Sequence, residues 1–164
     1  MTAIDPVAGR RALAQSLGLA DVRDTVPADQ AALGGAIQLA VECSGHERAV
    51  IDCCKVAAKR GEVVLVGVPW KKRCDASAFE VLHAVFHRYV VLRSGWEWEV
   101  PRHARDFIVG SIHGDLAGAL RWLKQGRVKV EGLASRVKPA QAQEVWQDLL
   151  NQRGAPTAVF DWAE

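Results

Sequence analysis

The chain has 164 residues, of which 49% are hydrophobic and 24% charged, and its formal net charge is +2, a composition typical of a globular domain. Acidic and basic residues are interspersed and no run reaches the roughly 18 apolar residues of a membrane span, so we expect neither a nucleic-acid partner nor a membrane segment. The four cysteines lack a repeated CxxC pattern and the N-terminus lacks a secretory signal, so we expect a reduced, cytoplasmic protein.

The first part of the chain alternates short apolar runs with segments of helical periodicity. We predict strands over residues 2–5, 21–24, 37–43, 62–68 and 89–92. We predict helices over residues 10–17, 47–58 and 79–87, and a loose helical turn over 30–33. The runs at 37–43 and 62–68 are apolar almost throughout, which is typical of strands buried on both faces of a parallel sheet.

After Gly95 the pattern becomes mainly helical. Helices are predicted over residues 104–112, 116–125 and 141–151, with short strands near 133–137 and at 157–160. Alternating strands and helices predict an α/β fold with a doubly wound parallel sheet. In such sheets, ligands bind at the carboxyl ends of the strands.

Asp5 follows the first predicted strand, and Arg10 opens the helix after it. In a dinucleotide-binding fold, an acid at this point accepts hydrogen bonds from the adenosine ribose hydroxyls. Its charge repels a 2′-phosphate, which favours NAD over NADP. The alternative is that Asp5 only begins the turn before Pro6.

Two further strand ends carry glycine. Ser44–Gly45 follows one buried run, and Val66–Gly67–Val68 ends the other. Glycine lets a flat ligand approach the backbone, where strand-end amides and carbonyls are available to it. Each glycine alone is also consistent with an ordinary turn. Together with Asp5, however, these residues mark three successive strand ends, which favours a cofactor cleft.

The histidines and cysteines give no metal site and no catalytic residue. His83 and His87 are four residues apart and could share a helix face, but no third ligand accompanies them. No GxSxG nucleophile motif occurs in the chain. We therefore expect no catalytic residue and no metal ligand.

This series of segments resembles the second half of the dinucleotide domain in medium-chain, zinc-type alcohol dehydrogenases. The similar segments are VECSG at 41–45, GEVVLVGVP at 61–69, LRSG at 92–95, and the C-terminal helices. The resemblance implies an NAD site in which Asp5 holds the adenosine ribose, with Arg10 beside it. It places Ser44 and Gly45 on the adenosine side of the cleft.

The same resemblance assigns the nicotinamide side of the site. It implies that Val66, Gly67 and Val68 pass under the nicotinamide ribose and carboxamide, and that Gly95 and Trp96 lie near the nicotinamide. It also implies two regions: residues 1–95 as a partial dinucleotide-binding domain, and residues 96–164 as a helical segment that returns to a catalytic domain.

Members of the resembled family carry zinc ligands and a GxGxxG-type loop ahead of the segment that corresponds to Ile4–Asp5. We therefore expect an incomplete Rossmann-like sheet, with a central strand missing between the strands that end at Asp5 and at Gly67. Zinc is expected only from a missing domain or a partner. Without the missing strand, backbone groups at the gap would be left unpaired.

Three explanations stay open: a second polypeptide supplies the missing parts, the true start lies upstream, or the chain is a remnant. The first functional hypothesis is the cofactor-binding portion of an NAD-dependent alcohol or polyol dehydrogenase that is not active alone. The alternative is a non-catalytic partner subunit without its own nucleotide binding. A homo- or hetero-oligomer is expected, with the strand at 89–92 as one pairing edge.

Overall fold

The computed structural model describes residues 1–28 and 37–163. Over these residues the fold is α/β, and every strand pairs in parallel with its neighbour. The strands form three small sheets, so the doubly wound sheet is incomplete, as expected. The helical turn predicted over 30–33 lies outside the described residues. No helix in the described part of the chain is long and apolar enough to cross a membrane.

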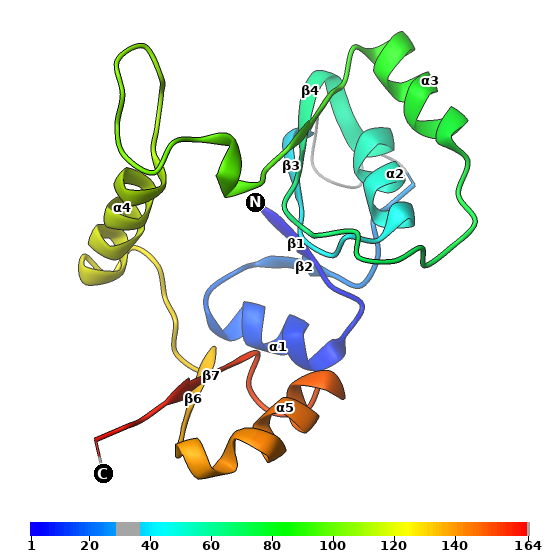
Figure 1. The fold of residues 1–164 in the computed structure, drawn as a ribbon. Coiled ribbons are helices and arrows are strands. Elements are labelled where there is room, and N and C mark those ends of the chain that lie inside the picture. The colour runs from blue at the N-terminus through cyan, green and yellow to red at the C-terminus, as the bar shows by residue number, and fades with distance from the viewer. Residues whose placement is uncertain (29–36, 164) are drawn as a thin grey trace.

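The largest sheet has the order β3-β4-β5, with β3 at Ile37–Glu42, β4 at Ala57–Leu65 and β5 at Val91–Ser94. Helices α2 (Glu47–Val56) and α3 (Ala78–Arg88) pack against each other and against β4 (Figure 1). The core lies between these helices and the sheet. Its buried side chains are Cys54, Ala57, Val63, Ala84 and Val90.

Local sequence explains where the two core helices begin and end. The His46 side chain accepts a hydrogen bond from the Arg48 amide at the start of α2, and the Ser77 hydroxyl accepts one from the Phe79 amide at the start of α3. Such side chains satisfy amides that have no partner within the first turn. Helix α3 ends at Tyr89, which takes a left-handed conformation with φ of 56°.

The strand predicted over 62–68 is β4, which begins at Ala57 and ends at Leu65, so the predicted helix over 47–58 ends two residues early. The prediction that two strands are buried on both faces is confirmed for Val63 and Val64 in β4 and wrong for β3. In β4, Val63 is fully buried and Val64 is 8% exposed. In β3, Ala40 packs against the core, but Leu39 and Val41 on the other face are 57% and 53% exposed. The difference arises because β4 is the central strand, whereas β3 lies at the edge and α2 covers only its core face.

The position of the expected gap is also corrected. Strand β4, which leads to Gly67, pairs on both sides, with β3 and β5. Strand β3, which ends at Glu42, pairs only with β4, so its other edge is unpaired. A missing central strand would therefore lie beside β3 and not beside β4.

A second sheet contains β1 (Thr2–Ile4) and β2 (Asp21–Arg23), and α1 (Ala8–Ser16) contacts both strands. These elements agree with the predicted strands and helix to within two residues. Helix α1 ends before Gly18, whose φ of 98° favours glycine.

The C-terminal part contains η2 (Glu97–Glu99), α4 (Ile112–Lys124), β6 (Ala134–Val137), η3 (Pro139–Gln141), α5 (Ala142–Leu150) and β7 (Thr157–Phe160). Strands β6 and β7 form the third sheet. Helix α4 stands well apart from α2 and α3 in Figure 1. Helices α1, α4 and α5 contain no buried residue.

The predicted helix over residues 104–112 is wrong. Residues 104–111 are irregular, and α4 begins only at Ile112. Phe107 and Gly110 have φ values of 64° and 88°, which a right-handed helix excludes. The Ser111 hydroxyl accepts a hydrogen bond from the Gly114 amide at 3.1 Å, so this serine fixes the start of α4.

Candidate functional site

The carboxyl ends of β3, β4 and β5 meet at one edge of the largest sheet. Glu42 on β3 lies opposite Leu65 on β4, and Leu65 lies opposite Ser94 on β5. The segments that follow these strands therefore lie next to each other. They carry seven of the nine predicted site residues: Ser44, Gly45, Val66, Gly67, Val68, Gly95 and Trp96.

Glu42 joins two of these segments. Its main-chain oxygen accepts hydrogen bonds from the amides of Val66 and Gly67, both at 2.8 Å. Its carboxylate accepts hydrogen bonds from the Ser44 amide at 2.6 Å, the Ser44 hydroxyl, and the Gly45 amide at 3.0 Å. Glu42 is only 3% exposed, and a buried carboxylate is stable only with such donors.

The prediction from sequence missed Glu42 as a residue that shapes the site. The signal was present, because an acid ends an apolar strand directly before Ser44–Gly45. The expectation that strand-end amides are available to a ligand is wrong at four positions. The amides of Ser44, Gly45, Val66 and Gly67 all donate to Glu42.

The glycines at this edge are required by the protein itself. A Cβ on Gly67 would lie 2.1 Å from the Gly45 nitrogen, and one on Gly45 would lie 2.4 Å from the Val68 oxygen. Gly45 also has a φ of 63°. The two loops thus cross so closely that only glycine fits, and a ligand is not needed to explain either residue.

Apolar side chains border the same edge. Val66 and Val68 are 49% and 46% exposed, and Trp96 is 62% exposed. Two shallow cavities, of about 150 and 200 Å³, lie elsewhere, the first beside Val145 and the second between Leu13 and Leu149. The exposed side chains at the edge of β3-β4-β5 can therefore contact a flat ligand by apolar packing, whereas the four bonded amides are not available to it.

Asp5, directly after β1, and Arg10, in α1, lie together beside the separate β1-β2 sheet. The Asp5 Oδ1 atom accepts a hydrogen bond from the Val7 amide at 2.8 Å, which closes a turn of the kind that aspartate forms with the backbone two residues on. Its Oδ2 atom lies 3.7 Å from Arg10 Nη1. The turn that the sequence offered as the alternative is thus present. The ribose contact stays a prediction.

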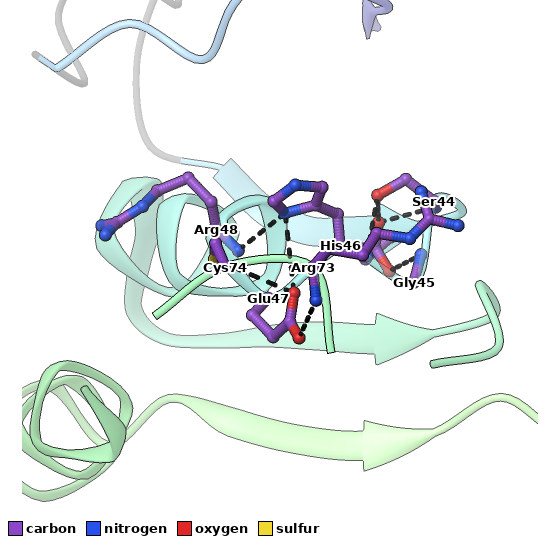
Figure 2. Close-up of polar contacts among 8 residues, drawn as sticks. Ser44, Gly45, His46, Glu47, Arg48, Arg73 and Cys74 are labelled. Atoms are coloured by element: carbon purple, nitrogen blue, oxygen red, sulfur yellow. Dashed lines mark hydrogen bonds and ion pairs between the residues drawn. The ribbon is translucent and has the colours of Figure 1, made fainter. Parts of the chain in front are cut away.

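A cluster that the sequence did not predict lies beside Gly45. His46 and Glu47 at the start of α2 meet Cys74 from the loop before α3, and potential ligand atoms of all three residues lie within 4.8 Å of one another (Figure 2). The His83 and His87 rings lie next to each other on α3, with centroids 4.4 Å apart and ring planes tilted by 44°. Among the described residues, however, the group of three possible metal ligands is the one that includes Cys74 and not the one on α3. Cys74 is 28 residues from His46 in sequence.

Comparison with known proteins gives the family. A model described as zinc-binding dehydrogenase matches residues 1–125. The chain belongs to this family. No match was found among curated proteins. The match to the family model covers both the β1-β2 sheet and the three strand ends that carry the predicted cofactor residues.

Solved structures of the same fold come from dehydrogenases. Galactitol-1-phosphate dehydrogenase from Escherichia coli is 19% identical with a TM-score of 0.69, over 92% of this chain and 43% of that one. L-Idonate 5-dehydrogenase from Escherichia coli is 21% identical with a TM-score of 0.66, over 96% of this chain and 42% of that one. A zinc-binding dehydrogenase from Sinorhizobium meliloti 1021, bound to NADP, is 20% identical with a TM-score of 0.61, over 88% of this chain and 41% of that one. The chain spans about two fifths of the length of these relatives.

Proposed function

We propose that this chain is the cofactor-binding portion of an NAD-dependent alcohol or polyol dehydrogenase and is not active alone. The observation that carries the proposal is the convergence of Ser44–Gly45, Val66–Val68 and Gly95–Trp96 at one edge of a parallel sheet. Ligands of such sheets bind at this edge. Membership of the zinc-binding dehydrogenase family and similarity in fold to galactitol-1-phosphate dehydrogenase and L-idonate 5-dehydrogenase support the class of reaction.

In this proposal the chain binds and orients NAD, which accepts the hydride from the alcohol. Val66, Val68 and Trp96 supply apolar contact for the nicotinamide side, where Gly67 keeps the backbone close to the surface. Asp5 supplies an acceptor for the adenosine ribose through Oδ2, because Oδ1 already binds the Val7 amide. Zinc, which polarises the substrate oxygen in metal-dependent hydride transfer, is proposed to come from another domain or chain.

We further propose a second polypeptide that completes the enzyme. The chain exposes 12218 Å², against roughly 8,000 Å² for a compact monomer of this mass. The unpaired edge of β3, with Leu39 and Val41 exposed beside it, supports the addition of a strand there. Residues 1–95 would form the cofactor-binding part and residues 96–164 would return to the catalytic domain.

The proposal is tested by titrating the chain with NADH in an isothermal calorimeter. We expect Asp5→Ala to weaken binding by about tenfold or more, because a hydrogen bond to a charged group is lost. The matched control is Asp161→Ala, since Asp161 also faces an arginine, with Oδ2 3.6 Å from Arg136 Nη1. Equal affinities of all three proteins would remove Asp5 from the site.

The alternative function is a non-catalytic partner subunit without nucleotide binding of its own. One observation favours it, namely that four amides at the candidate edge are already bonded to Glu42. Absence of heat on titration with NADH, from chain whose circular dichroism shows it to be folded, would support this alternative and contradict cofactor binding by the chain alone.

A further inference from the structure

We propose that His46, Glu47 and Cys74 bind a divalent transition-metal ion, for which Zn²⁺ is the best match. One imidazole nitrogen, one carboxylate oxygen and the thiol sulfur lie within 4.8 Å of one another. They come from two chain segments, the start of α2 and the loop before α3 (Figure 2). This inference goes beyond the proposed function and does not depend on it.

The two distances from Glu47 to the other residues of the cluster are close to those of a zinc site. Glu47 Oε2 lies 3.8 Å from His46 Nδ1 and 3.8 Å from Cys74 Sγ. Ligands around a tetrahedral zinc ion, with bonds of about 2.0–2.3 Å, lie roughly 3.4–3.6 Å apart. A contraction of a few tenths of an ångström along both edges would bring Glu47 to the separation that the metal requires.

The chemical nature of the donors selects the metal. Sulfur and imidazole ligands suit zinc and other late transition metals, whereas Mg²⁺ and Ca²⁺ prefer sets made of oxygen alone. Three protein ligands leave a fourth tetrahedral position open to water or to another ligand. His46 and Glu47 side chains are 37% and 30% exposed, so an ion can reach them from solvent.

The carboxylate is already oriented for this role. The Arg73 amide donates a hydrogen bond to Glu47 Oε1 at 2.9 Å, and the other oxygen is left facing His46 and Cys74. Bonds of this kind fix ligand orientation in metal sites.

The His46 imidazole turns Nδ1 toward the cluster. This atom accepts a hydrogen bond from the Arg48 amide at 3.2 Å and lies 3.8 Å from Glu47 Oε2. Coordination through Nδ1 would exchange this bond for the metal. Asparagine is a good helix cap but has no imidazole, so His46→Asn tests the ligand while keeping an acceptor for the start of α2.

The first experiment is a titration of the full chain with Co²⁺, followed by absorption and by displacement with Zn²⁺. We expect one ion per chain, with a thiolate-to-cobalt charge-transfer band that is lost in Cys74→Ser. Loss of Cys74 or His46 should reduce affinity by more than the roughly 10–100-fold that removal of an outer hydrogen-bond partner costs. Cys43→Ser and His83→Ala are matched controls, because their residues lie outside the cluster, and both should bind normally.

The second experiment is alkylation of the folded chain with and without Zn²⁺, read by mass spectrometry. Zn²⁺ should protect Cys74 and leave the labelling of the exposed Cys43 unchanged, which makes Cys43 an internal control. The proposal is overturned by absence of Co²⁺ and Zn²⁺ binding, by a cobalt–thiolate band that survives in Cys74→Ser, or by loss of binding in His83→Ala with retention in His46→Asn.

Discussion

Two regions of this chain have similar secondary structure but very different packing. All the buried hydrophobic residues of the described chain lie between Ile51 and Val90, within α2, β4, α3 and the residue after Tyr89. Helices α1, α4 and α5 bury none of their residues. Helical periodicity therefore predicts that a helix forms, while burial depends on whether another element covers its apolar face.

Helix α4 shows this contrast most clearly. Its apolar residues Leu116, Leu120 and Leu123 recur at helical spacing but are 60%, 65% and 42% exposed. In α2, Ile51 and Cys54 have the same kind of spacing and are 2% and 0% exposed. The difference is that α2 lies between a sheet and α3, whereas Figure 1 shows no element over α4 among those described.

The largest effect is expected where the packed region is tightest. Gly67→Ala would place a Cβ 2.1 Å from the Gly45 nitrogen. The nearest atoms it would meet all belong to the backbone, which cannot turn away as a side chain can. We expect a loss of about 3 kcal/mol or more in the free energy of unfolding, because the crossing loops must separate. Gly154→Ala is the control, since a Cβ there meets nothing within 4 Å and only the φ of 73° is strained, at a cost of about 1–2 kcal/mol. Equal losses in urea denaturation would contradict the close approach.

The next effect compares two valines in parallel strands. Val63 in β4 is fully buried, and Val159 in β7 is 52% exposed. We expect Val63→Ala to lower the free energy of unfolding by about 2 kcal/mol through the cavity it leaves. Val159→Ala should change it by less than about 0.5 kcal/mol. Equal shifts of the urea midpoint by both variants would contradict the difference in packing between the region around β4 and the C-terminal part.

The smallest effect concerns the contact that joins α2 to α3. Glu80 accepts a hydrogen bond from Lys55, which lowers its pKa below the ordinary value of 4.5, and it also pairs with Arg48. A lowered pKa contributes stability above the unfolded-state value, and this contribution is lost as the pH falls from about 4.5 through the folded-state pKa. Glu80→Gln should therefore lose stability slightly at pH 7 and show a shallower decrease below pH 4.5. Thermal unfolding over this pH range measures the difference, and parallel curves for the two proteins would rule out the contribution.

The sequence by itself determined the α/β class, the family and the order of elements. Apolar runs and turn residues located β3, α2 and the end of β4 because these are local patterns, in which period and capping depend on neighbours in the chain. They missed residues 57–61, the first part of β4. The helix expected over 104–112 failed because Phe107 takes a left-handed conformation that no local pattern indicates. The segments that follow β3, β4 and β5 were correctly expected at strand ends, because parallel strands share one carboxyl edge.

Only the tertiary structure decided what those strand ends do. The pairing of β4 with both neighbours showed that β3 is the open edge, and this depends on strand order, which the apolar pattern does not encode. Folding also directed four amides to Glu42 and brought Cys74 beside His46 and Glu47. These contacts join residues from different loops, and their geometry is set by how the loops cross between α2 and the sheet rather than by any spacing along the chain.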